Sequence, residues 1–167
     1  MSNTASSYFR TVRGYQLANK KEGQLTSAME DYLEMVFRLC EERGYARVVQ
    51  ISDLLHVKPS SASKMISKLV DLDYLQSDRY EVIRLTQSGC KIGKYLLKRH
   101  ETVETFLKLV GSLTPLEETE LIEHTLNPST VSAISVLNDF FAEDPEARQR
   151  FLTFSRQTAE QSKAGLP

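Results

Sequence analysis

The 167-residue sequence predicts a mainly α-helical fold, in which a winged helix-turn-helix unit is followed by an all-helical segment. Three observations predict it. Apolar residues recur at intervals of three and four over most of the chain, two short helical patterns meet at a proline, and two short β-prone runs follow them. Apolar residues make up 41% of the chain and charged residues 26%, as is usual for globular proteins, so wholesale disorder is excluded.

The first predicted helix follows a polar arm of residues 1–23, which we expect to be flexible. Its apolar residues share one face of a helix and are Met29, Leu33, Val36, Phe37 and Cys40. Thr26 or Ser27 can cap the start of this helix, and Glu30 completes a capping-box pattern after Ser27. Gly44 is expected to end it, because glycine readily adopts the left-handed conformation at a helix C-terminus.

Two short helices with a tight turn between them are predicted next. The first runs from Val49 to Val57, with three residues pointing inward: Ile51, Leu54 and Leu55. Pro59 opens a second helix that reaches about Leu72. Its apolar face consists of Ala62, Met65, Ile66 and Leu69. Its other face has no acidic residue and consists of Ser60, Ser61, Ser63, Lys64, Ser67 and Lys68. This arrangement is typical of a helix-turn-helix that binds DNA, with an ordinary amphipathic pair of helices as the alternative.

A β-hairpin, or wing, is predicted after these helices. Residues 74–77 and 82–85 are short β-prone runs, and they flank the turn-like sequence 78–81. Arg79 and Tyr80 stand at the tip of this hairpin, where they could contact phosphate or the minor groove of DNA. A wing that follows a recognition helix favours a DNA-binding unit.

The rest of the chain is predicted to be helical. Thr86 can cap a long helix whose inner stripe is Ile92, Leu96, Val103, Leu107 and Val110, the last of these near its end. Three further helices are expected at about 115–126, 128–141 and 145–161. Each begins with proline after a capping residue: Thr114-Pro115, Asn127-Pro128 and Asp144-Pro145. Glu117 completes a capping box with Thr114.

The charges are unevenly distributed along a chain of net charge −1. Residues 44–100 carry ten basic and five acidic side chains, net +5, whereas residues 101–167 carry five basic and eleven acidic side chains, net −6. This favours a polyanion-binding lobe joined to a lobe of another function, with ordinary scatter of surface charge as the alternative. No apolar run approaches the roughly 18 residues that cross a membrane, and no secretory signal or disulfide framework is evident. We therefore expect a cytoplasmic protein with no membrane partner.

Six side chains of metal-ligating type occupy three places in the predicted helices. They are Asp31 and Glu34 on the first helix, the inward-pointing His100 on the long helix, and Glu120, Glu123 and His124 on one face of the next helix. Taken alone, each group has a structural explanation: helix-dipole partners, a core histidine, or a solvated face. If the helices converge, four carboxylates repel one another and the pattern requires no nearby Lys or Arg, so two divalent cations would resolve the repulsion. Oxygen-rich ligation with two imidazoles and no thiolate suits Mn²⁺ or Fe²⁺ and also admits Zn²⁺ or Co²⁺.

With these motifs in place, the sequence resembles the diphtheria toxin repressor family of metal-dependent transcriptional repressors, specifically its manganese transport regulator branch. The resemblance covers roughly residues 25–145. It is carried by Met29-Glu-Asp-Tyr-Leu-Glu34, Gly44-Tyr-Ala-Arg-Val48, Lys58-Pro-Ser-Ser61, Lys64-Met65, Lys68-Leu69, Leu85-Thr86, Lys91-Ile-Gly-Lys94, Arg99-His-Glu101 and Glu120-x-x-Glu-His124. The family's metal ligands fall on the same six residues. Members of the iron type have Met in place of Asp31 and Cys in place of Glu120, so carboxylates at both positions favour manganese.

The resemblance implies a homodimer that binds palindromic double-stranded operator DNA and represses metal-uptake genes when divalent metal bridges its two domains. The candidates near base edges are Ser60, Ser61 and Lys64, and those nearer the DNA backbone are Arg47, Lys68, Arg79 and Tyr80. The predicted dimer interface is an apolar stripe, defined here as Val131, Ile134, Leu137, Phe140 and Phe141. The alternative is that this stripe serves only the core of its own chain.

We divide the chain into a flexible arm (1–23), a DNA-binding domain (24–86) and a metal-binding and dimerisation domain (87–167), linked by the long helix of about 87–110. One rival function is a winged-helix regulator that responds to an organic ligand or to oxidation of Cys40 or Cys90, which leaves the convergent carboxylates unexplained. A metal-dependent hydrolase is the remote rival. It is disfavoured because the inverted zinc motif needs histidine at position 120, and because six ligands leave no evident base or nucleophile. We expect no enzymatic activity.

Overall fold

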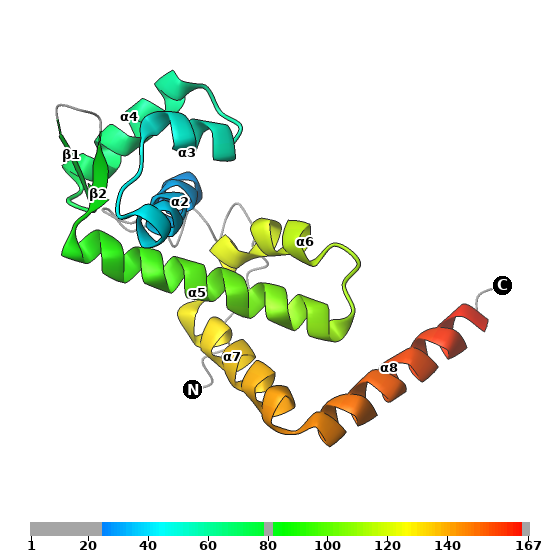
Figure 1. Cartoon of the computed structure of the whole chain (residues 1–167). Coiled ribbons are helices and arrows are strands. Elements are labelled where there is room, and N and C mark those ends of the chain that lie inside the picture. Colours follow the sequence, from blue (N-terminus) through cyan, green and yellow to red (C-terminus); the bar gives the residue numbers. More distant parts are fainter. Residues whose placement is uncertain (1–24, 79–81, 165–167) are drawn as a thin grey trace, which may run out of the picture.

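The computed structural model describes residues 25–78 and 82–164, with side-chain surroundings described as far as Thr158 (Figure 1). This part of the chain forms seven α-helices, one short 3₁₀ helix and a two-stranded sheet. The mainly α-helical, winged helix-turn-helix fold class is therefore confirmed. The predicted arm and the predicted wing tip with Arg79 and Tyr80 lie outside the described residues.

Helix α2 (Ser27–Arg43) has the ends that its local sequence predicts, with one exception. The Thr26 hydroxyl accepts a hydrogen bond from a first-turn backbone N–H at 3.3 Å. Gly44 ends the helix in the left-handed region, with φ 79°. The capping box expected from Ser27 and Glu30 is wrong, because Thr26 is the cap and the Glu30 carboxylate makes long-range contacts instead.

The helix-turn-helix unit and its wing follow in the predicted order. Their elements are α3 (Val48–Leu54), α4 (Pro59–Asp71), β1 (Leu75–Ser77) and β2 (Ile83–Leu85). The two strands are antiparallel, with Leu75 opposite Leu85 and Ser77 opposite Ile83. An isolated bridge between Ala46 and Ile83 connects the wing to the segment after α2. Backbone hydrogen bonds between Ala46 and Ile83 thus anchor strand β2 of the wing.

A single apolar core joins this unit to α2. Its most deeply buried members come from every surrounding element and are Leu33, Val36, Ile51, Leu69, Leu75, Ile83 and Leu96. Leu54, which was predicted to point inward, is 51% exposed. The prediction fails because α3 ends at Leu54 and presents Ile51 to the core. Burial of these side chains from water is the main force that holds the unit together.

Helix α5 (Gln87–Val110) is the central element, since α2, α6 and α7 all pack on it (Figure 1). Thr86 caps it as predicted, through a hydrogen bond from a first-turn N–H at 3.0 Å. Gly93 allows α2 to approach closely, because a Cβ atom at this position would lie 2.7 Å from the Cβ of Phe37. Val110 was predicted to point inward but is 41% exposed, since it is the last residue of the helix.

The remaining helices begin at the predicted prolines. They are α6 (Pro115–Ile122), the 3₁₀ helix η1 (Glu123–Thr125), α7 (Pro128–Glu143) and α8 (Pro145–Ala164). Of the three predicted caps, only Asp144 forms, accepting a hydrogen bond from the Ala147 N–H at 2.8 Å. The side chains of Thr114 and Asn127 make no capping hydrogen bond in the described structure, so the capping box of Thr114 with Glu117 is wrong.

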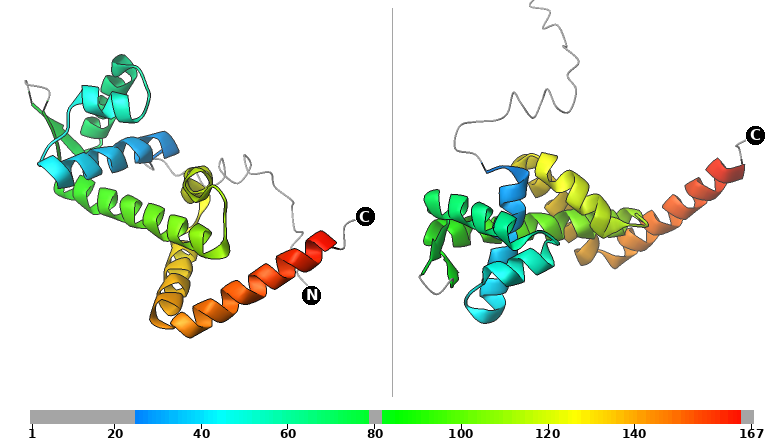
Figure 2. Two further views of the ribbon diagram at one scale, coloured as in Figure 1. Left: turned by 45° about the vertical axis from the view of Figure 1, so that its right-hand side comes forward. Right: turned by 90° about the horizontal axis from the view of Figure 1, so that it is seen from above.

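Helix α8 extends away from the other described elements and meets α7 at a sharp corner (Figure 2). The rings of Phe141 and Phe151 lie 5.2 Å apart at this corner. Large apolar side chains are exposed along both helices: Val136, Leu137, Phe140 and Phe154. Within the predicted interface stripe, Val131 is buried in the core of its own chain, whereas Leu137 and Phe140 face solvent. Part of the stripe therefore lies outside the core of its own chain.

Candidate metal centre

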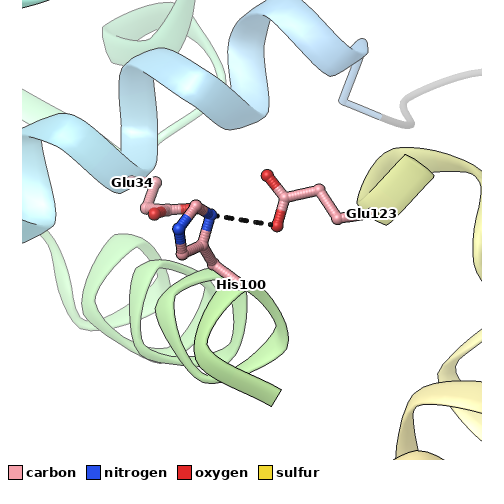
Figure 3. Close-up of side chains that lie close together, drawn as sticks. All are labelled: Glu34, His100 and Glu123. Carbon is pink, nitrogen blue, oxygen red and sulfur yellow. Dashed lines mark ion pairs between the residues drawn. The ribbon is translucent and has the colours of Figure 1, made fainter. Parts of the chain in front are cut away.

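Three side chains from distant parts of the sequence meet beside α5 (Figure 3). Glu34 comes from α2, His100 from α5 and Glu123 from η1. Each offers one potential ligand atom, and these atoms all lie within 4.8 Å of one another. All three side chains are buried, and Glu123 is only 2% exposed. Two carboxylates and an imidazole at this separation form a donor set that suits a divalent cation.

Helix geometry places these side chains together. His100 lies four residues after Leu96 and three before Val103, both of which are buried, so it shares their inward face. The close approach of α2 to α5 at Gly93 brings Glu34 toward that face. Helix α6 was predicted to continue to residue 126, but it ends at Ile122. Glu123 therefore projects from a 3₁₀ turn.

Several polar atoms at the centre have unmet hydrogen-bonding capacity. Among the described residues, Nδ1 of His100, Oε2 of Glu123 and Nε of Arg99 are buried without a hydrogen-bond partner. His100 Nδ1 and Glu123 Oε2 face each other at 3.4 Å. Interaction with the Glu123 carboxylate raises the pKa of His100, against the opposing effect of burial. Buried polar atoms without partners are costly, so these atoms are suited to a ligand that both could bind.

His124 forms a second, adjoining cluster. Its Nε2 lies 2.8 Å from Oδ1 of Asp31, and its Nδ1 lies 2.8 Å from Oε2 of Glu30 and 3.0 Å from Nη2 of Arg99. These two carboxylates raise the pKa of His124 to about 10, although burial opposes the shift. Oε2 of Glu30 also accepts a hydrogen bond from Nη2 of Arg99 at 2.9 Å. Despite the cost of burial, these hydrogen bonds lower the pKa of Glu30.

Glu120 lies at the open side of the centre. Its side chain is largely exposed, and Oε1 is 3.6 Å from Nδ1 of His100. Partial burial and the nearby Glu123 carboxylate raise its pKa. The structure thus brings all six predicted ligands to one region, with Glu34, His100 and Glu123 in the tightest group and Asp31 and His124 paired beside them.

Three charged residues of the centre were missed at the sequence level: Glu30, Arg38 and Arg99. The sequence pattern required no Lys or Arg at the centre, yet Arg99 is buried between Glu30 and Glu123 and Arg38 pairs with Glu34. Spacing could have revealed Arg38, since it lies four residues after Glu34 on one helix. No local pattern marks Arg99 or Glu30, which meet across 69 positions of sequence.

A pocket of about 230 Å³ opens onto this centre. Its polar lining includes five of the six candidate ligands together with Arg38: Asp31, Glu34, Arg38, His100, Glu120 and Glu123. Met35 of α2, Leu55 of the helix-turn-helix unit and Leu116 of α6 complete the wall. The pocket therefore lies between the DNA-binding unit and the C-terminal helices.

Five of the predicted DNA-contacting residues lie within the described part of the chain, and all five are exposed on the helix-turn-helix unit. Ser60, Ser61, Lys64 and Lys68 are exposed on α4, and Arg47 is exposed at the start of α3. The Arg47 guanidinium lies 5.8 Å from the centre of the Tyr45 ring. These side chains are accessible to a polyanion.

A winged helix-turn-helix joined to a helical unit through a carboxylate–imidazole centre defines a class of protein, the metal-responsive DNA-binding regulators. The sequence matches the description "Iron dependent repressor, N-terminal DNA binding domain" over residues 24–83. Residues 86–152 match "Iron dependent repressor, metal binding and dimerisation domain". The chain belongs to this family, the diphtheria toxin repressor family, as its sequence motifs predict.

Curated relatives narrow the comparison. The chain is 44% identical to the HTH-type transcriptional regulator MntR of Shouchella clausii over 121 residues, which cover 71% of this chain and 85% of that protein. It is 39% identical to MntR of Bacillus subtilis over 135 residues, covering 80% of this chain and 95% of the relative. The protein is therefore a metal-dependent transcriptional repressor, with a divalent metal as cofactor, and not an enzyme.

Solved structures agree with the fold. T. acidophilum IdeR matches with a TM-score of 0.58 at 29% identity, covering 66% of this chain and 53% of that one. The manganese regulator SloR matches with a TM-score of 0.59 at 26% identity, covering 70% of this chain and 55% of that one. The chain thus spans about half the length of these solved chains. Within its described part, no helix is both long enough and apolar enough to cross a membrane.

Proposed function

We propose that the protein is a manganese-responsive repressor that binds palindromic operator DNA as a homodimer and controls metal-uptake genes. The observation that carries this proposal is the cluster of Glu34, His100 and Glu123 at the junction of α2, α5 and η1, in which Nδ1 of His100 and Oε2 of Glu123 are buried without a hydrogen-bond partner. Carboxylates at Asp31 and Glu120 support manganese over iron, because the iron-type members of the family carry Met and Cys there. The manganese-regulator relatives support the same choice.

The proposed ligands are the six residues expected from the sequence: Asp31, Glu34, His100, Glu120, Glu123 and His124. Two Mn²⁺ ions per chain would balance the four carboxylates, and Fe²⁺, Co²⁺ or Zn²⁺ could be accepted by the same donor types. When bound, the ions supply positive charge that relieves repulsion among these carboxylates. The six residues come from α2 on one side and from α5, α6 and η1 on the other, so an ion bound by them would connect these elements.

The proposed mechanism is a restriction of motion. Helix α2 shares its core with the helix-turn-helix unit, and η1 belongs to the C-terminal helices. When side chains of α2, α5 and η1 bind one ion, these three elements can adopt fewer relative positions. In a homodimer, the range of distances between the two α4 helices would then narrow toward the 34 Å or so that separates successive major grooves on one face of DNA.

We propose three segments of the chain, together with its DNA-binding surface and its dimer interface. The arm is 1–23, the DNA-binding domain 24–86 and the metal-binding and dimerisation domain 87–167. Ser60, Ser61 and Lys64 would read base edges, and Arg47, Lys68, Arg79 and Tyr80 would contact the DNA backbone. The apolar stripe of α7 would form the dimer interface. A regulator triggered by oxidation of Cys40 is less well supported, because burial raises the pKa of this thiol and so lowers its reactivity.

The test replaces Glu123 with glutamine, which keeps the shape of the side chain and removes its charge. We expect Glu123→Gln to fold normally and to lose at least about tenfold of its Mn²⁺-dependent operator affinity, since one buried ligand is weakened. Fluorescence anisotropy with labelled operator DNA, with and without Mn²⁺, measures this. Glu117→Gln, an exposed change on α6, is the matched control. A normal Mn²⁺ response of Glu123→Gln would contradict the proposal.

A further inference from the structure

Arg38 forms a salt bridge with Glu34, one of the candidate ligands. Its Nε and Nη2 both donate to Oε1 of Glu34, at 3.0 and 2.7 Å. Arg38 also lines the pocket that opens onto the centre. A guanidinium with two hydrogen bonds to one carboxylate oxygen is a strong partner for that oxygen.

The pair forms within a single helix. Glu34 and Arg38 are four residues apart on α2, so their contact does not depend on how α2 is placed relative to the C-terminal helices. The Glu34 side chain is 10% exposed, whereas the Arg38 side chain is 41% exposed. The Arg38 side chain therefore extends from the surface toward Glu34, and its guanidinium can be solvated by water when it leaves Glu34.

Arg99, the other arginine of the centre, is differently placed. Its side chain is 5% exposed and is held by Glu30 at 2.9 Å. It therefore acts as a fixed part of the core. The charge of Arg38 also stands at the centre, because its Nη2 lies 2.7 Å from Oε1 of Glu34 and its side chain lines the pocket. A divalent cation beside Glu34 is repelled by this charge.

We propose that Arg38 is a built-in competitor of the metal ion for Glu34, which raises the free metal concentration at which the repressor loads. The metal must displace the guanidinium from Oε1 before Glu34 can serve as a ligand. This inference rests on the proposed function, since it assigns Arg38 a role at the same centre.

The experiment is a calorimetric Mn²⁺ titration of chelator-treated protein. Arg38→Gln should bind Mn²⁺ about three- to tenfold more tightly than the wild-type chain, as expected when one partly exposed positive charge is removed from beside a dication. Arg43→Gln is the matched control, because it removes the same charge from the last turn of α2, where Arg43 pairs with the exposed Glu42. Its affinity should equal that of the wild type. Circular dichroism of the metal-free variants checks that all of them fold.

A second variant separates charge from hydrogen bonding. Arg38→Lys keeps the positive charge but cannot donate through two nitrogens of a planar group, so its affinity should fall between those of wild type and Arg38→Gln. Affinity of a folded Arg38→Gln that is equal to or weaker than wild type would overturn the competitor role alone. Wild-type protein that binds no Mn²⁺ would overturn the proposed function and this inference with it.

Discussion

His124 shows how one residue can join two elements of the centre. Its ring nitrogens lie 2.8 Å from Glu30 and from Asp31, both on α2, and so connect η1 to the helix that carries the DNA-binding core. With its pKa raised to about 10, the imidazole carries a positive charge that partly balances the carboxylates, a role that Arg99 and Arg38 share. Side-chain cations thus supply part of the charge that a metal ion supplies when bound.

The pKa of His124 predicts a pH dependence of metal binding. A histidine must be neutral to ligate a metal, and in the metal-free protein the pKa of His124 is about 10. The group is therefore protonated at neutral pH and must release its proton on ligation, so metal affinity should rise with pH and fall as the solution becomes acidic. Mn²⁺ titrations at pH 7, in two buffers with different ionisation enthalpies, should reveal release of at least about one proton per chain.

The control for this measurement is His56→Gln, which changes an exposed turn residue outside the centre and should leave the proton count unaltered. Equal binding heats in both buffers would mean that no proton is released, and would remove His124 from the ligand set.

At the scale of elements, the contact between α2 and α5 determines where Glu34 and His100 meet. Gly93 lies so close to Phe37 that an added methyl group would force the helices apart. Gly93→Ala is expected to lower the free energy of unfolding by about 1–3 kcal/mol, the usual cost of overpacking a core. Urea denaturation of the metal-free protein measures this.

Lys94→Ala, at the next and exposed position of α5, should change stability by less than about 0.5 kcal/mol. If Gly93→Ala proved as stable as the wild type, the two helices would have room to adjust, and the close approach would not be what positions the centre.

The elements also show what could be predicted from sequence and what could not. Thr26 and Thr86 cap the starts of α2 and α5, and Gly44 ends α2, all as expected. Such caps can be predicted because they depend on residues a few positions apart. The early end of α6 was missed because Glu123 and His124 are held by charged groups of α2 and α5, which are distant in sequence. The candidate ligands were identified from residue type and spacing together with the family resemblance, whereas the contacts of Arg99 with Glu30 and Glu123 appear only in three dimensions.

For the whole molecule, the exposed apolar residues of α7 favour a second copy as their partner. Phe140 is 52% exposed and Leu137 39% exposed, although both are strongly apolar. Phe140→Glu should therefore shift the protein toward monomer and weaken operator binding at least about tenfold, because two linked half-sites bind far more tightly than one. Sedimentation velocity and anisotropy measure the two effects.

Ser132→Glu places the same charge on an exposed position of α7 outside the apolar stripe, and should leave both the assembly and the affinity as they are. An unchanged sedimentation coefficient for Phe140→Glu would exclude this stripe as the dimer contact.

The close packing of α2 on α5 lowers the entropic cost of binding a metal ion. Two of the three elements that carry the candidate ligands are already joined by the apolar core, so their donor atoms are preorganised before any ion arrives. The segment that carries Glu120, Glu123 and His124 follows α5 through a short link that begins at Gly111, with φ 88°. A stiffer or looser link would change the cost of ordering these three side chains around an ion, and so the metal sensitivity, with every ligand left unchanged.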